Sequence, residues 1–198
     1  MTLKDFSRYI QTKAKEQEEL IRRRMPVIAG QMAVSHFKEN FQKSGFVNGG
    51  LHRWQPAKRI GMGKGAESNR KTLTSGRNHL MSSIYYVPGD GSVKVYNPVE
   101  YAGIHNEGGQ VNVHPTVTAK MKKFAWAKYY AALNGQNPNK NTTIPEDAAR
   151  WRALALTKKT KLNIRYVMPK RQFIGEGSEL TEKINNKLDA ELEKIWNL

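Results

Sequence analysis

The chain contains no cysteine, and its 198 residues include no long apolar run. The absence of cysteine excludes disulfides, thiolate nucleophiles and zinc sites with cysteine ligands. No stretch approaches the roughly 20 apolar residues that a helix needs to cross a bilayer, so we expect no membrane span and no membrane partner. The first twenty residues carry charges throughout and lack the apolar segment of a secretory signal, which favours synthesis and use in a cytoplasm.

Acidic residues are also scarce, with 17 Asp and Glu against 33 Lys and Arg and a net charge of +16. The excess is concentrated in the middle: residues 41–80 carry 8 basic and 1 acidic side chains, and residues 119–171 carry 13 and 2. Segregated positive charge predicts a surface that faces a polyanion such as nucleic acid, although a basic surface without such a partner has the same composition. The cations that we expect to face DNA are Lys58, Arg59, Lys64, Arg70, Lys71, Lys120, Lys122 and Lys123.

Apolar spacing predicts long helices at both ends of the chain. Within the N-terminal segment 1–41, apolar residues from 20 to 41 recur near a 3.6-residue period, which indicates one helix from residue 3 or two that Pro26 separates. The polar first half is either an arm that orders against a neighbour or a solvent-facing helix with ion pairs from Glu19 to Arg22 and Arg23. At the other end, Ser178 is expected to cap an amphipathic helix. Its apolar face consists of Leu180, Ile184, Leu188, Leu192 and Ile195.

The middle of the chain reads as short strands, turns and an insert. Residues 42–72 are expected to be a basic loop in which Trp54 is a local anchor, and the Gly-Lys of its GMGKG sequence lacks the spacing of a phosphate-binding loop. Thr74 or Ser75 is expected to cap a short helix around residues 80–84. Strands are expected at 84–87 and 93–96 about a turn, then at 110–117 and, half-buried, at 158–168. A short helix at 99–107 should end at Gly108-Gly109, and residues 119–157 should form an inserted helical lobe. We therefore predict a single α+β domain over residues 1–198, with a small antiparallel sheet, long N-terminal and C-terminal helices and the inserted lobe.

Catalytic patterns are missing. The five histidines show no metal-ligand spacing, few acids lie between residues 81 and 171, and no Gly-x-Ser-x-Gly nucleophile turn occurs. His105 with Glu107 resembles the start of a zinc-deaminase signature whose cysteine half this chain lacks. We therefore expect no enzymatic activity, no catalytic residue, no metal and no cofactor, and we expect the His105 imidazole to hydrogen-bond the backbone.

Two segments carry a family resemblance. The first begins Leu-Thr-Ser-Gly at residues 73–76 and, after the expected hairpin, continues as Tyr-Ala-x-x-His-x-x-Gly-Gly at 101–109; the second is Pro-x-Arg-x-Phe at 169–173, before the last helix. In this order they resemble the tailed-bacteriophage virion morphogenesis family, which includes Mu-type G tail completion proteins and related neck or tail-terminator proteins. The resemblance covers roughly residues 30–118 and 160–197, and segments 57–72 and 119–157 depart from it. The motif residues, expected to be structural or to lie at interfaces, are Gly76, Tyr101, Ala102, His105, Gly108, Gly109, Pro169, Arg171 and Phe173.

The resemblance implies a structural protein of the virion, made in a bacterial host cytoplasm and placed at the head–tail junction or the tail end. Members assemble as homo-oligomeric rings, commonly hexamers, which cap the tail or join it to the head. The implied partners are connector or stopper proteins, tail tube or sheath proteins, and genomic DNA that crosses the lumen without being read in sequence. The alternative that the charge pattern supports is a free basic protein that binds nucleic acid directly.

Overall fold

The computed structural model describes residues 2–61, 65–133 and 144–196, and it divides the chain into two compact units. The first comprises residues 1–109 and 168–198, and the second comprises residues 110–167. The elements of the first unit are α1 (Leu3–Glu19), η1 (Leu20–Arg24), α2 (Met25–Lys43), β1 (Gly45–Val47), β2 (Leu51–Arg53), η2 (Ala66–Asn69), α3 (His79–Ser82), β3 (Tyr85–Pro88), β4 (Val93–Tyr96), α4 (Ala102–Glu107) and α7 (Ser178–Trp196). Between α4 and α7 the chain forms β5 (Gly109–Val113), α5 (Ala119–Ala132), α6 (Glu146–Leu156) and β6 (Ile164–Met168).

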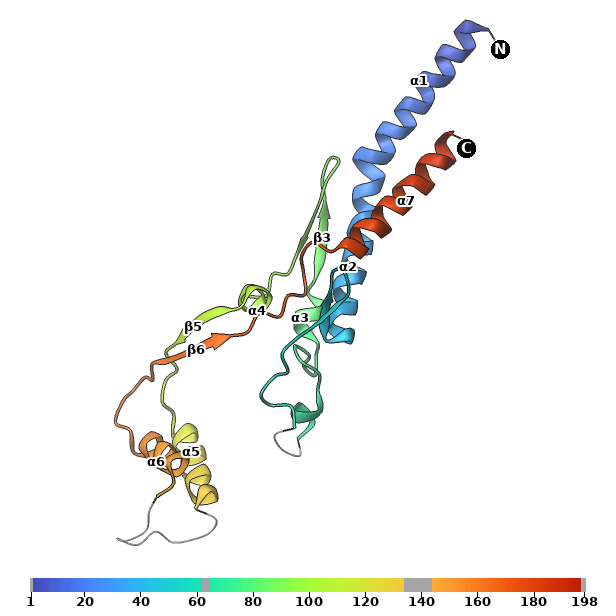
Figure 1. The fold of residues 1–198 in the computed structure, drawn as a ribbon. Coiled ribbons are helices and arrows are strands. Elements are labelled where there is room, and N and C mark those ends of the chain that lie inside the picture. The colour runs from blue at the N-terminus through green and yellow to red at the C-terminus, as the bar shows by residue number, and fades with distance from the viewer. Residues whose placement is uncertain (1, 62–64, 134–143, 197–198) are drawn as a thin grey trace. The chain divides into compact units, whose positions relative to one another are not determined.

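The predicted α+β class is confirmed, with long helices at both ends of the chain (Figure 1). The described strands form three separate two-stranded sheets, β1–β2, β3–β4 and β5–β6, where one small sheet was expected. Pairs this small need packing against other elements to be stable, because an isolated hairpin is marginal in water. No helix in the described part of the chain is both long and apolar enough for a bilayer.

The N-terminal helices follow one another without a break, and Pro26 marks the point where their hydrogen bonding changes. The five residues of η1 form a π-helical turn, and Met25 N–H bonds to the Leu20 carbonyl across it. Pro26 has no N–H to give to the Arg22 carbonyl, four residues earlier. That carbonyl instead accepts a hydrogen bond from Gly91 N–H, at 2.9 Å, in the turn between β3 and β4. The predicted interruption at Pro26 is therefore a wide turn onto which a hairpin docks.

The Arg22 side chain strengthens the same contact. Its guanidinium forms a two-point ion pair with Asp90 in the hairpin turn, with Nε 2.7 Å from Oδ1, and it also bonds to Glu18 at 3.0 Å. The expected partner Glu19 is wrong, because Glu18 lies four residues before Arg22 and faces it along the helix. The hairpin then runs along α2, where Gly30 permits close approach: a Cβ at this position would lie 2.2 Å from Cδ2 of Tyr86.

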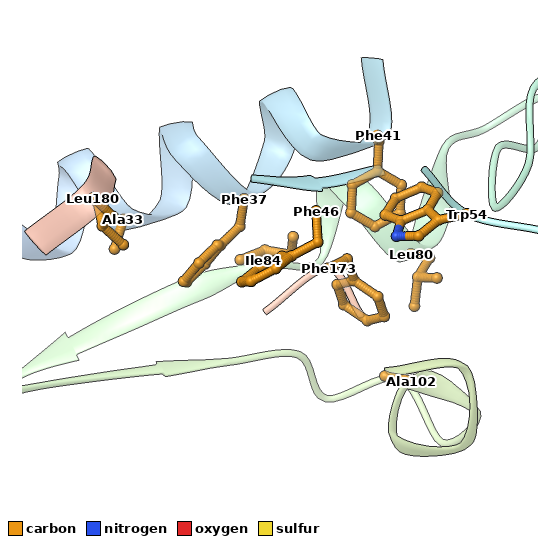
Figure 2. Close-up of a cluster of buried hydrophobic side chains, with 10 residues drawn as sticks. All are labelled: Ala33, Phe37, Phe41, Phe46, Trp54, Leu80, Ile84, Ala102, Phe173 and Leu180. Carbon is orange, nitrogen blue, oxygen red and sulfur yellow. The ribbon is translucent and has the colours of Figure 1, made fainter. Parts of the chain in front are cut away.

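The main core of the first unit lies beneath α2 and is largely aromatic (Figure 2). The Phe41 ring packs against Trp54 and Phe173, with ring centroids 5.4 and 5.1 Å apart. Trp54 is buried, so its predicted role as an anchor is confirmed. The expectation that residues 42–72 are entirely loop is wrong, since β1 and β2 pair between Gly45 and Arg53 and bring Phe46 into this core. The buried members of the cluster are Ala33, Phe37, Phe41, Phe46, Trp54, Leu80, Ile84, Ala102, Phe173 and Leu180.

Helix α7 has the predicted apolar face. Leu180 joins the main core, and Ile195 packs with Leu20 and Met25 in a second cluster, which Ile184, Leu188 and Leu192 border. The start of this helix differs from the prediction: Ser178 is its first residue, and Ser178 Oγ accepts a hydrogen bond from Gly49 N–H at 2.9 Å. The Glu179 carboxylate accepts from Gly49 and Gly50 N–H, at 3.1 and 2.9 Å. These bonds hold the β1–β2 turn against the start of α7.

In the second unit, α5 and α6 pack as a pair around Tyr129, Leu133 and Ala148. The predicted helices within 119–157 are present, and the residues between them, 134–143, lie outside the described part. Strands β5 and β6 pair, and Thr116 and Lys161 form a further antiparallel bridge. The expected half-burial of the 158–168 strand is wrong, because residues 164–167 of β6 are all exposed and Val167 is 72% exposed.

The hydrogen bonds to Glu179 predict a dependence of stability on pH. Bonds from its own backbone N–H and from Gly50 N–H lower the pKa of Glu179 from 4.5 to about 2. A carboxyl whose pKa falls on folding stabilises the folded state above its ordinary pKa, and this contribution is lost as pH falls from 4.5 through about 2. We expect Glu179→Gln to be less stable than wild type above pH 5. The difference between their free energies of unfolding should narrow toward pH 2. Urea unfolding followed by tryptophan fluorescence at several pH values measures both, with Glu176→Gln, at an exposed position just before α7, as the control. A difference in the free energy of unfolding that does not change with pH would contradict the lowered pKa of Glu179.

Candidate functional site

The two family-like motifs meet at the segment 169–177, which has no strand partner and is held mainly by side chains. Trp54 Nε1–H donates to the Gln172 carbonyl at 2.7 Å, and Asn40 Nδ2–H donates to the Phe173 carbonyl at 3.3 Å. Phe173 is 1% exposed, so a backbone group left unpaired here would cost roughly the free energy of a lost hydrogen bond. Trp54 and Asn40 thus secure the carbonyl side of this segment.

Helix α4 secures the N–H side of the same segment. Arg171 N–H donates to the His105 carbonyl at 2.8 Å. The Asn106 side chain accepts from Phe173 and Ile174 N–H at 2.9 and 3.0 Å, and its Nδ2–H donates to the Ile174 carbonyl at 3.1 Å. Asn106 thus supplies the donor and acceptor pattern of a neighbouring strand from a single amide.

Gly108 ends α4 against this segment, as predicted. Its φ of 72° lies in the left-handed region, and a Cβ there would lie 2.7 Å from Lys170 N. Only glycine meets both conditions without strain. Gly109 follows with a φ of 125°, and Pro169 opens the segment on the other side. The Gly-Gly and the Pro-x-Arg-x-Phe motifs are therefore two halves of one contact.

Arg171 carries the charge of the site. The residue is only 7% exposed, and its guanidinium donates to the Gln55 carbonyl at 2.9 Å and the Pro56 carbonyl at 3.5 Å. Burial lowers the pKa of Arg171, and the positive charge of Arg59 lowers it further, although a guanidinium stays protonated in proteins. Arg59 is itself bound to the carbonyls of Lys71 and Thr74, both at 2.9 Å. Two guanidinium groups are thus fixed by loop carbonyls close to one another.

His105 lies beside them as a neutral imidazole. Burial lowers the pKa of His105, and the charge of Arg171 lowers it further, so the ring is uncharged at pH 7. The ring meets Tyr101 edge to face, with centroids 5.8 Å apart. Its buried Nδ1 has no hydrogen-bond partner in the described part of the chain, so this nitrogen does not form the expected bond to the backbone. The backbone carbonyl of His105, in contrast, accepts the hydrogen bond from Arg171 N–H.

These groups line a pocket of about 250 Å³, which we call the Arg171 pocket. Its wall combines two guanidiniums, an imidazole and several hydroxyl groups with apolar carbon, an arrangement that suits an anionic group on an apolar stem. The lining residues are Ala57, Arg59, Thr72, Leu73, Thr74, Ser75, Leu80, Tyr101, His105 and Arg171. The structure thus brings Tyr101, His105 and Arg171 together with Arg59, which sequence reasoning had assigned to a DNA-facing surface.

The other motif residues have structural positions. Ala102 and Phe173 are core residues. Gly76 lies outside the Arg171 pocket, where a Cβ would be 3.2 Å from Nη2 of Arg70.

The remaining cations that we expect to face DNA are divided between the two units. Lys58 is exposed; Lys71 is also exposed, but its Nζ bonds to the Gln42 carbonyl at 2.7 Å, and Arg70 pairs with Glu67. Lys64 lies outside the described residues. Residues Lys120, Lys122 and Lys123 belong to α5 of the second unit. Since the basic segments fall in different units, their union into one DNA-facing surface stays a prediction.

Sequence reasoning missed Asn106 and Asn40, although they hold the segment 169–177. Asparagine is a residue type that is usually exposed or in a turn, and neither residue belongs to a recognised motif. The one available signal was that position 40 falls in the apolar period of α2, beside Phe37 and Phe41, and the structure buries Asn40 completely there. A buried amide needs a partner, and here that partner is a backbone carbonyl.

No protein-family model, curated protein or solved structure matches this chain. The resemblance of its motifs to the virion morphogenesis family therefore stays a prediction. Among the described residues, no three His, Asp or Glu side chains are grouped so as to hold a metal ion.

Gly108 offers a test of the contact between the motifs. We expect Gly108→Ala to lower the free energy of unfolding by about 2 kcal/mol or more, because alanine is strained at positive φ and its Cβ meets the Lys170 backbone. Gly103→Ala, in the same helix with open space around it, is the matched control and should change stability by less than about 1 kcal/mol. Chemical unfolding of both variants makes the comparison, and equal effects would refute the proposed packing.

Asn106 offers a second, independent test. Asn106→Ala leaves Phe173 and Ile174 N–H without their acceptor, so we expect a loss of about 2–4 kcal/mol in the free energy of unfolding. Asn106→Asp keeps the acceptor oxygen but loses the bond to the Ile174 carbonyl and places a carboxylate beside Glu107, so its stability also falls. Amide hydrogen exchange separates the two variants, because exchange at Phe173 and Ile174 should accelerate more in the alanine variant than in the aspartate variant. Equal acceleration would mean that the two accepted bonds contribute little.

Proposed function

We propose that this protein is a structural component of a tailed-phage particle, which assembles as a homo-oligomeric ring, a hexamer, at the neck or the tail end. The motif order that resembles the virion morphogenesis family supports the class of protein. The observation that carries the proposal is the exposed apolar surface of α1, because exposed apolar surface is typical of protein–protein contact sites.

Helix α1 has no buried residue over its 17 residues. Its apolar side chains Leu3, Phe6 and Ile10 lie on one face, and the first two are 89% and 50% exposed. The same face continues through Gln17, which accepts a hydrogen bond from Trp196 Nε1–H at 3.2 Å, to the fully buried Leu20. The first half of α1 thus extends the seam between the N-terminal helices and α7 past the end of α7 (Figure 1).

An isolated helix of this length is marginal in water, so a partner that covers the exposed face would stabilise it. The exposed face favours the interpretation of α1 as an arm that orders against a neighbour. Further apolar side chains are exposed on the β3–β4 hairpin, among them Tyr85 and Val87, and others on the second unit, among them Leu156. A ring has two different faces in each subunit contact, so distinct apolar surfaces on one chain suit it.

The remaining parts of the proposal follow from charge. Non-specific contact with the phosphates of DNA needs Lys and Arg but no base-reading element. The basic segments would supply that contact in the lumen of the ring, with connector or stopper proteins and tail tube or sheath proteins as the axial neighbours. The protein would then act by assembly and not by catalysis, and its location would be the virion.

The apolar arm gives a direct test. Phe6→Gln/Ile10→Gln should abolish or strongly weaken the oligomer, as mass photometry would show, while the near-ultraviolet circular dichroism of the rest of the fold stays close to wild type, because neither residue is buried. Arg8→Gln/Thr12→Gln, on the opposite face of α1, is the control and should assemble normally.

Two results would contradict the proposal. In the phage, deletion of the gene should leave filled heads and tails unjoined, so normal tailed particles would exclude the function. In solution, a wild-type monomer or dimer that binds DNA with an affinity falling steeply with salt would favour the free nucleic-acid-binding protein. Electron microscopy of the protein within its particle would display its symmetry and position at once.

A further inference from the structure

The Arg171 pocket contains two cations without an anion. All 17 Asp and Glu residues of the chain lie in the described part, yet none forms an ion pair within 4.0 Å of Arg59 or Arg171. Burial of a guanidinium without a counter-charge is costly, and two of them near each other add repulsion. The loop carbonyls satisfy some of their donors but leave the charge uncompensated.

One residue of the pocket wall, His105, also has an unpaired polar atom. His105 Nδ1 is buried and has no partner among the described residues, although a buried polar atom normally has one. Ser75 and Tyr101 add hydroxyl groups to the wall, and Leu73 and Leu80 add apolar carbon. We propose that the Arg171 pocket binds a carboxylate side chain of a neighbouring copy of this chain.

A carboxylate fits this site better than a phosphate of duplex DNA. A planar carboxylate matches the planar guanidinium fork, and one negative charge in the pocket offsets one of the two guanidiniums. An aspartate or glutamate brings a short apolar stem that suits the Leu73 and Leu80 wall. A phosphodiester is flanked by sugars on both sides, and Arg171, at 7% exposed, lies too deep to reach a duplex backbone.

The chain itself presents a source of that carboxylate. Glu182, Asp189 and Glu193 lie on one exposed face of α7, at spacings of seven and four residues, and none forms an ion pair in the described part of the chain. Residues 175–198 carry 6 acidic and 3 basic side chains in a chain of net charge +16, so this face is complementary to the pocket. The choice of a second copy as the source of the carboxylate rests on the proposed homo-oligomer.

The binding of a carboxylate is tested first on the isolated protein, with sodium acetate as the probe. We expect a saturable shift of the His105 ring resonances in NMR spectra when acetate replaces chloride at constant ionic strength. Arg59→Gln should weaken acetate binding about tenfold, the effect of losing one charge-assisted hydrogen bond. Lys58→Gln, in the same loop, should leave it unchanged. Because Arg171→Gln risks unfolding the protein, Arg59→Lys serves as the second variant, which keeps the charge and loses the fork, and it should also weaken binding.

Other results would overturn the carboxylate. The absence of saturation by acetate, or equal binding by Arg59→Gln, would exclude the pocket as an anion site without bearing on the assembly through α1. A shift of the His105 resonances by a short DNA duplex, with none by acetate, would assign the pocket to phosphate.

The source of the carboxylate is tested by assembly. Glu182→Gln/Asp189→Asn/Glu193→Gln should weaken the oligomer about as much as Arg59→Gln, and the combination of both should be no worse than either, because each removes the same contact. Acetate should bind the α7 variant as it binds wild type. Normal assembly of that variant, with acetate binding intact, would reject the neighbouring copy as donor while leaving the oligomer itself established.

Discussion

The first unit depends on how a buried segment without a strand partner satisfies its backbone. Residues 171–174 cross the aromatic core, and their N–H and carbonyl groups bond to the His105 carbonyl and to the side chains of Asn106, Trp54 and Asn40. Because these partners come from α4, the loop after β2 and α2, the segment joins three elements that share no sheet. Phe173 then fills the space between them. An unpaired group here would cost more than most surface interactions contribute.

The β3–β4 hairpin meets the N-terminal helices at a second junction, where a free backbone group is again paired. Pro26 withholds one N–H, the helix widens into η1, and the released Arg22 carbonyl bonds to Gly91 in the hairpin turn. The Arg22 guanidinium and Asp90 add charge to that contact. In both junctions, a backbone group without a partner in its own helix or strand forms a hydrogen bond to an element far away in the sequence. These bonds hold the small two-stranded sheets against the long helices.

Two features of the protein surface favour assembly with other chains. Helix α1 exposes apolar side chains along a seam that α7 covers only in part, and the Arg171 pocket holds positive charge that no carboxylate of the same chain offsets. Each feature is unfavourable in an isolated chain and favourable against a partner. An apolar partner would cover the first and an acidic partner would neutralise the second, and the proposed ring of identical subunits would provide both from the same chain.

Periodicity and turn chemistry alone determined the α+β class, the apolar face of α7, the β3–β4 hairpin and the end of α4 at Gly108, because each follows from local rules. The same rules missed the β1–β2 hairpin, whose strands have three residues each, and misjudged the burial of β6. Tertiary structure decided the roles of Asn40 and Asn106 and placed Arg59 in the wall of the Arg171 pocket. These roles depend on which backbone groups and charges meet across separations of 67 to 133 residues, and such separations leave no periodic trace in the sequence.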